Sequence, residues 1–193
     1  MTRMEMPPTT PQGDLPLRLQ HLAEAGGLIN VFRMMLRSPA IASEVVGLGA
    51  VQFAESTLTP VDREIAILTV STCYDAEYES AQHDPISRAV GVTDEQRAAL
   101  AAMEWGSACF DPAQQSLIRF SASVASSPTV PDDVFEAVRT HYTDRQVVEL
   151  VIQAGYYFLI ARVATVLQVP IDPPADDRVF KAGLTVAAAD LRQ

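Results

Sequence analysis

Apolar residues recur every three or four positions along most of the chain, which is the spacing of an amphipathic helix. After Asp111, for example, Leu117, Phe120 and Val124 share one helical face. No segment alternates cleanly between apolar and polar residues between hairpin turns, so strands are not expected. The pattern predicts helices at about residues 15–24, 28–37, 40–53, 60–73, 76–90, 94–104, 112–126, 131–141 and 144–168. We therefore expect an all-α fold.

Four of these helices begin with capping signals. A cap side chain accepts a hydrogen bond from a backbone N–H in the first turn, and proline is tolerated at the first helical position. The signals are Thr59-Pro60 with Asp62, Thr93 with Gln96, Asp111-Pro112, and Thr143 with Gln146.

The predicted helix at 60–73 is apolar on every side after its charged start. A helix of this kind is buried all round, either at the centre of its domain or at a subunit interface. Glu64 lies one turn into it, on the same face as Val61 and Leu68. Its carboxylate is therefore expected to point into the core.

The chain has 193 residues, enough for one domain with a sizeable core. The Pro-rich segment 1–14 is expected to be a disordered arm without the apolar core of a secretory signal. Residues 15–172 are expected to form the helical domain. Residues 173–193 are expected to be a C-terminal tail that wraps a neighbouring subunit.

Charge and composition narrow the class of protein. Acidic residues exceed basic ones by 24 to 14, and no basic cluster occurs, so nucleic acid is not expected as a partner. The two cysteines, Cys73 and Cys109, are too few for a disulfide framework, which favours a reduced, cytoplasmic protein. The apolar run 150–169 contains Gln153, Arg162 and Gln168, which favours a buried helix over a membrane span.

Two ionisable residues interrupt the apolar stripe of the predicted helix 76–90. Glu79 and His83 share the face of Ile86 and, at a spacing of four residues, can touch. A buried carboxylate raises the pKa of a nearby imidazole and desolvation lowers it, so such a pair suits proton transfer near neutral pH. The alternative is a partly exposed ion pair on the helix surface, with no role in chemistry.

Arg162 lies in the apolar helix 144–168, where a guanidinium needs a partner. The partner is either a structural carboxylate or a carboxylate of the substrate. Other chemistries lack their motifs: the spacing of Glu79 and His83 offers two metal ligands where three or four are needed, and neither a GxSxG turn nor a phosphate-binding glycine loop is present. No metal or organic cofactor is expected.

Three segments together resemble a known family. "REIAILTVSTCYDAEYESAQHDPISRAVGVTDEQRAAL" is similar to the central motif of the carboxymuconolactone decarboxylase family, which includes the alkylhydroperoxidase D-like proteins. "NVFRMMLRSPAIA" resembles the family's opening segment and "VVELVIQAGYYFLIARVATVLQVPID" its closing helix. The resemblance covers roughly residues 28–172. It implies an alkylhydroperoxidase D-like helical fold and a homo-oligomer, a trimer or hexamer, packed through its central helices.

The resemblance also implies a division in chemistry. The peroxidase branch carries a CxxC pair ahead of its histidine, and this chain has Ala76 and Glu79 at those positions. Disulfide-based peroxide reduction is therefore not expected. Glu64, Glu79 and His83 remain as an acid–base set, which resembles the decarboxylase branch.

The leading hypothesis is a cofactor-independent lyase or isomerase that acts on a small carboxylated, enolisable substrate, in aromatic degradation or natural-product biosynthesis. His83 is the expected acid and base, Glu79 its orienting partner and Glu64 a second proton-relay group. Tyr78, Tyr156 and Arg162 are the expected substrate-binding residues. Two alternatives remain: a non-catalytic small-molecule-binding or oligomeric scaffold protein, and a residual peroxidase that uses Cys73 alone.

Overall fold

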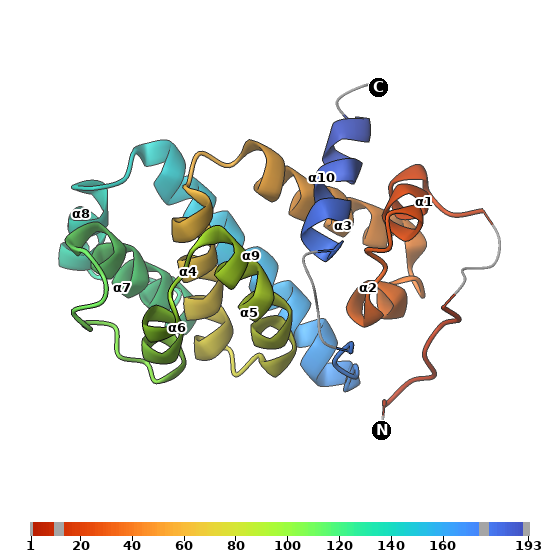
Figure 1. Cartoon of the computed structure of the whole chain (residues 1–193), viewed down its shortest axis with the longest axis horizontal. Coiled ribbons are helices and arrows are strands. Elements are labelled where there is room, and N and C mark those ends of the chain that lie inside the picture. The colour runs from red at the N-terminus through yellow and green to blue at the C-terminus, as the bar shows by residue number, and fades with distance from the viewer. Residues whose placement is uncertain (1, 10–13, 174–177, 191–193) are drawn as a thin grey trace. The chain divides into compact units, whose positions relative to one another are not determined.

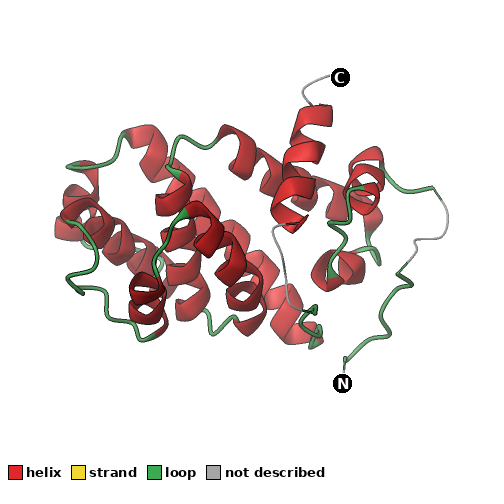
Figure 2. Ribbon diagram, in the orientation of Figure 1, coloured by secondary structure: helices red, strands yellow, loops and turns green. Residues whose placement is uncertain are grey.

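The structure is a computed structural model that describes residues 2–9, 14–173 and 178–190, without the side chains of 178–180. These residues form helices and no strand, as Figure 2 shows, so the predicted all-α fold is confirmed. The helices are α1 (Leu17–Glu24), α2 (Asn30–Met35), α3 (Pro39–Glu55), α4 (Pro60–Cys73), α5 (Glu77–Val90), α6 (Asp94–Ala101), α7 (Pro112–Ser126), α8 (Asp132–Arg139), α9 (Asp144–Leu167) and α10 (Arg178–Asp190) (Figure 1). The nine predicted helices correspond to α1–α9, with ends that differ by a few residues.

The chain divides into two compact units. The first unit contains residues 1–56 and 162–193, and the second contains residues 57–161. This division differs from the expected arm, domain and tail, because the two ends of the chain join the same unit. Glu64, Glu79 and His83 all belong to the second unit.

In the second unit, α4 packs against α5, α6 and α7. Every residue of α4 from Arg63 to Ser71 is buried. The predicted burial of this helix on all sides is confirmed. Of the two expected settings, the structure shows the centre of the unit, because neighbouring helices of the same unit pack against α4.

The predicted caps begin their helices as expected. The Thr59 hydroxyl accepts from the backbone N–H of Asp62 at 3.1 Å. Thr93–Gln96 and Asp111–Gln114 form complete capping boxes, and the Thr143 hydroxyl accepts from the backbone N–H of Gln146 at 3.3 Å. These contacts are local in sequence, so the sequence alone could specify them.

A tight connection joins α4 to α5. Asp75 has φ 52°, in the left-handed region, and the backbone N–H of Ala76 donates to the carbonyl oxygen of Ser71 at 2.9 Å. A left-handed residue after a helix ends it and turns the chain back. The connection returns α5 along α4, and α5 continues through Pro85 to Val90.

The first unit has its own core, in which α10 packs against α1 and α3. Leu19, Leu22 and Val46 are buried with Ala182 and Val186 of α10. The expectation of a C-terminal tail is therefore wrong for residues 178–190, because the small apolar residues of this segment form a helical packing face. Residues 174–177 and 191–193 lie outside the described residues.

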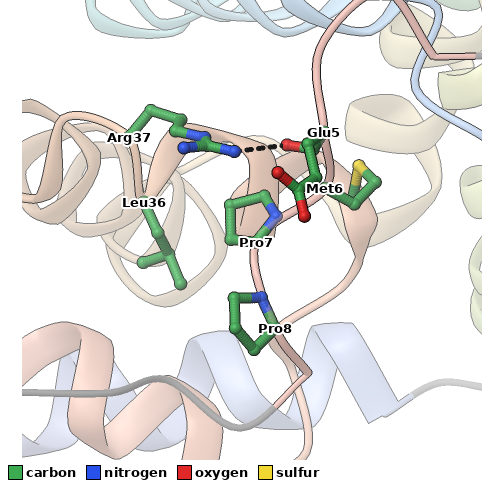
Figure 3. Close-up of a pocket in the computed structure, with 6 residues that line it drawn as sticks. All are labelled: Glu5, Met6, Pro7, Pro8, Leu36 and Arg37. Atoms are coloured by element: carbon green, nitrogen blue, oxygen red, sulfur yellow. Dashed lines mark hydrogen bonds between the residues drawn. The ribbon is translucent and has the colours of Figure 1, made fainter.

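The N-terminal segment 2–9 has no regular structure, but two arginines hold it. Arg33 donates to the carbonyl oxygen of Pro7 at 2.6 Å, and Arg37 donates to that of Glu5 at 2.7 Å. Figure 3 shows the second bond at a pocket of about 280 Å³. Through these two bonds the backbone carbonyls of Pro7 and Glu5 contact this unit. Residues 1 and 10–13 lie outside the described residues.

Helix α9 is only partly buried. Six large apolar side chains on it are more than 40% exposed: Val148, Val151, Ile152, Phe158, Leu159 and Val166. Within the described part of the chain, α9 alone has the length and composition to cross a membrane, with a mean hydropathy of 1.6, and 44% of its apolar window is buried. A core helix of a soluble protein meets the same criterion. The expectation of a buried helix holds for one face of α9 and is wrong for the other.

Candidate functional site: a buried acid–base cluster

Glu64 provides the most deeply buried charge of the second unit, since its side chain has no exposed surface. Its Oε2 atom lies 2.8 Å from Nδ1 of His83, and its Oε1 atom lies 3.5 Å from Nε of Arg63. A carboxylate is tolerated in a core when a hydrogen bond and a positive charge compensate for the lost water. The prediction that Glu64 points into the core is confirmed.

His83 lies on α5, with only 7% of its surface exposed. Its ring stands edge-on to Tyr157 of α9, with 5.0 Å between the ring centroids. Because Nδ1 faces a carboxylate, the hydrogen bond assigns the proton of the neutral ring to Nδ1. Nε2 is then the basic nitrogen.

The partner of His83 differs from the one expected from spacing. Glu79 shares a helix face with His83, yet neither Glu79 oxygen accepts a hydrogen bond from another described residue. Glu64 makes the bond instead, from a different helix. The spacing of four residues brings two side chains near each other without fixing their rotamers, whereas the packing of α5 on α4 points the imidazole at Glu64.

Glu79 is 2% exposed, and its carboxyl group has a strongly raised pKa. Burial raises its pKa to about 7, against smaller lowering effects from its own backbone N–H and from His83. At neutral pH this side chain therefore exists in both protonated and ionised forms. A carboxyl group in that state can donate a proton as well as accept one.

Two tyrosines of α9 lie at this cluster, and one of them packs against His83. Tyr156 and Tyr157 are buried, and their rings pack edge-to-face with 5.3 Å between centroids. Burial raises the pKa of Tyr157 well above its usual value, and the charges of Glu64 and Glu79 add to this effect. Tyr157 therefore remains a neutral hydroxyl beside the two carboxyl groups.

The expected substrate-binding residues have different outcomes. Tyr78 and Tyr156 are buried in the second unit, and burial also raises the pKa of Tyr156. Arg162 belongs to the first unit and its side chain is exposed. The expectation that Arg162 lies in a core is therefore wrong.

Three polar residues of the cluster were missed by sequence reasoning. Arg63 is 4% exposed and lies beside Glu64. The Gln153 amide donates to the carbonyl oxygen of Arg63 at 3.4 Å, and its own oxygen has no partner within the described part of the chain. Gln82 is buried next to His83. The available signals were the adjacency of Arg63 to Glu64 and of Gln82 to His83, and the interruption of an apolar run by Gln153.

The two cysteines, Cys73 and Cys109, are both partly buried. Both thiols are free. Cys73 is half-buried at the end of α4, and burial raises the pKa of its thiol, with a smaller lowering effect from Ser126. Cys109 donates to the hydroxyl of Ser107 at 3.3 Å. A raised pKa lowers the thiolate fraction, which disfavours a peroxidase that depends on Cys73 alone.

Across residues 2–9, 14–173 and 178–190 no group of three His, Cys, Asp or Glu side chains could hold a metal ion. What the arrangement offers is an imidazole held by a carboxylate, a second carboxyl group of raised pKa, a guanidinium and a neutral tyrosine. Such a set can move protons and stabilise a small negative charge.

These helices form an all-α fold of the alkylhydroperoxidase D-like type. A peroxidase-related protein from Ralstonia eutropha JMP134, described as an alkylhydroperoxidase AhpD core, matches with a TM-score of 0.74 and 20% identity, over 94% of this chain and 96% of that one. A peroxidase-related protein from Silicibacter sp. TM1040 matches with a TM-score of 0.74 and 18% identity, over 89% and 92% of the two chains.

A third relative is the debrominase Bmp8, solved in complex with 2,3,4-tribromopyrrole. It has a TM-score of 0.67 and 16% identity, over 86% of this chain and 89% of that one. No protein with a curated description matches the sequence. The model of the carboxymuconolactone decarboxylase family matches residues 39–121, from α3 into α7, the segment that carries Glu64, Glu79 and His83.

Proposed function

We propose that this protein is a cofactor-independent lyase or isomerase that moves a proton on a small enolisable substrate. The observation that carries the proposal is the buried 2.8 Å bond between His83 Nδ1 and Glu64 Oε2, beside a second carboxyl group whose pKa is raised to about 7. A histidine oriented by one carboxylate, beside a second carboxyl group of raised pKa, is a usual arrangement of a base and an acid.

His83 acts as the base in this proposal. Its Nε2 atom removes a proton from the carbon next to a carbonyl group, and the electron pair of the broken C–H bond forms an enolate. Glu64 is a positioning residue, because it holds the ring in the tautomer that leaves Nε2 basic. Glu79 then supplies a proton to another carbon of the enolate. Isomerisation results, and the base and the acid exchange their protonation states.

The same groups support decarboxylation. Loss of carbon dioxide leaves the electron pair of the broken C–C bond on the substrate as an enolate, and the acid protonates one carbon. Arg63 replaces Arg162 as the candidate anchor for a substrate carboxylate, because its buried guanidinium lies beside Glu64. Tyr78 and Tyr156 remain proposed walls of the binding site. The small planar ring bound by Bmp8 is compatible with a substrate of this size on this fold.

Self-association belongs to the same proposal, and its best support is the exposed face of α9. Gly155 lies in the middle of that face, where an added Cβ would meet no atom within 4 Å. Beside it is a hollow of about 480 Å³ lined by Val151, Phe158 and Tyr74, among others. An apolar face of this size favours a homo-oligomer, a trimer or hexamer. The free thiols are compatible with a cytoplasmic location.

The test is solvent-deuterium uptake in heavy water, followed by mass spectrometry. The probes are carboxymuconolactone and a panel of small unsaturated lactones and cyclic ketones, with carbon dioxide release measured in parallel. The proposal predicts uptake or release with at least one probe, and loss of that signal in folded His83→Ala. If probes bind but none exchanges or reacts, the protein is a binding or scaffold protein.

A further inference from the structure

Gln82 is a buried side chain with an unexplained hydrogen-bonding capacity. It lies on α5 with 5% of its surface exposed, and neither its amide nitrogen nor its amide oxygen has a hydrogen-bond partner among the described residues. Glu79, one turn earlier, has two carboxyl oxygens in the same condition. Buried polar groups without partners are rare in folded proteins, because desolvation is then uncompensated.

A second buried glutamine shows what a structural role looks like in this chain. Gln96 is 8% exposed, and all of its amide groups are used. Its nitrogen donates to the Cys109 carbonyl oxygen at 3.1 Å and to Gln114 Oε1 at 3.2 Å, and its oxygen accepts from the Thr93 N–H at 3.1 Å. Gln82 has none of these contacts, so it does not hold helices together in this way.

The position of Gln82 links it to the acid–base cluster. Glu79, Gln82 and His83 are separated by three and four residues and lie on one face of α5, with about 5–6 Å between such Cβ atoms. They are consecutive among the buried residues of that face, before the apolar Ile86. His83 is close enough to Glu79 to lower the pKa of that carboxyl, and Gln82 is the next buried residue of the same helix face.

We propose that Gln82 and Glu79 bind the carbonyl oxygen of the substrate, so that the reacting end of the substrate is a neutral carbonyl group, as in a cyclic ketone or ester, and not a carboxylate. The Gln82 amide and the protonated Glu79 carboxyl each donate one hydrogen bond, and a carbonyl oxygen can accept both. The raised pKa of Glu79 supports this assignment, because an ionised Glu79 would repel the oxygen as it becomes negative.

The step balances without any further reactant. A C–H bond next to the carbonyl breaks, its proton goes to His83 Nε2, and its electron pair forms a carbon–carbon double bond. The carbonyl π pair moves to oxygen, where the two donors stabilise the charge. Gln82 is a substrate-binding residue in this scheme, and the assignment rests on the proposed function above.

Phenols test this site without turnover, because a phenolate oxygen on a planar ring has the shape and charge of an enolate. The probes are 4-nitrophenol, 3,4-dinitrophenol, phenol and 4-cyanophenol, titrated into the full chain with binding followed by absorbance and calorimetry. Wild-type protein is expected to bind at least one of them, and Gln82→Leu is expected to weaken that binding about 10- to 100-fold. Gln96→Leu is the matched control and should leave binding unchanged.

Thermal midpoints separate a binding role from a structural one. Gln82→Leu removes two unpaired buried atoms, so its midpoint should stay equal or rise, while Gln96→Leu loses real hydrogen bonds and should unfold at a lower temperature. The inference is overturned if no phenol binds wild type at millimolar concentration, or if Gln82→Leu binds normally. If His83→Ala loses exchange and Gln82→Leu binds phenols normally, the proposed function stands and the role of Gln82 is excluded. If phenol binding depends on Gln82 but no probe reacts, the proposed function is excluded and the binding role of Gln82 stands.

Discussion

His83 and Glu64 lie 19 positions apart in sequence and share a buried hydrogen bond of 2.8 Å between Nδ1 and Oε2. The bond crosses from α5 to α4, so it depends on how these two helices pack. It turns a single histidine into an oriented base, and it makes the α4–α5 pair the structural centre of the proposed chemistry.

His83→Ala should lower turnover about 10²- to 10⁴-fold, because the base is removed. His83→Gln should do nearly the same, because an amide does not titrate. Glu64→Gln should also cost about 10²-fold or more, since an amide at this position can hold the ring in the wrong tautomer. The measurement is turnover on one substrate, with circular dichroism to verify folding. Full activity in His83→Ala would exclude the proposed base.

Glu79 should make stability depend on pH. Its pKa rises from 4.5 to about 7 on folding, so the folded chain favours the neutral form. The stability that this gives is present below about pH 4.5 and is lost as the pH rises to about 7, a change of about 3 kcal/mol. Urea unfolding at pH 4.5 and pH 8 should show this loss in wild type, and Glu79→Gln should remove it.

Glu79→Gln also tests catalysis, because the amide keeps a hydrogen-bond donor but has no ionisable proton to transfer. Above pH 7 this variant should be more stable than wild type and yet turn over more slowly. Identical pH dependence of stability in the two proteins would show that the Glu79 carboxyl ionises normally in the folded chain.

The exposed face of α9 should mediate self-association. Val151→Asp and Phe158→Asp place a charge on residues that are each 46% exposed, so they should shift the protein toward monomer in light scattering. Met103→Asp is the control, because Met103 is 53% exposed on a connection after α6. If the wild-type protein is a monomer at micromolar concentration, the exposed face of α9 does not mediate self-association.

Asp75 should matter through its backbone. Its φ of 52° suits glycine, so Asp75→Gly should leave stability unchanged or raise it by up to about 1 kcal/mol. Asp75→Val should lower stability by about 1–3 kcal/mol, because a β-branched residue is strained there. Chemical denaturation measures both values. Equal stability of the two variants would mean that the turn relaxes out of the left-handed region.

Cys73→Ser should leave proton-transfer turnover unchanged, because the proposed chemistry uses no thiol. Wild-type protein should also reduce organic hydroperoxides no faster than this variant. Cys109→Ser is the matched control for the second thiol. Peroxide reduction that disappears only in Cys73→Ser would revive the peroxidase alternative.

The sequence by itself determined the helices α1–α9 and most of their starts. Periodicity and caps such as Thr59 and Asp111 act within a few residues, so their physics is contained in the local sequence. The same locality made Glu64 recognisable as a core residue, since Val61 and Leu68 on its helix face are apolar. The segment after residue 173 was misjudged, because its small residues become a packing face only against α1 and α3.

Only the tertiary structure decided which groups meet. Spacing favoured Glu79 as the partner of His83, but the packing of α5 on α4 selected Glu64. An apolar run suggested a buried Arg162, but its side chain is exposed, because the exposed face of one helix depends on what other helices cover. Gln82 could not be identified as unsatisfied until its surroundings were known. Hydrogen bonds, burial and pKa depend on distances across helices, and sequence spacing does not contain those distances.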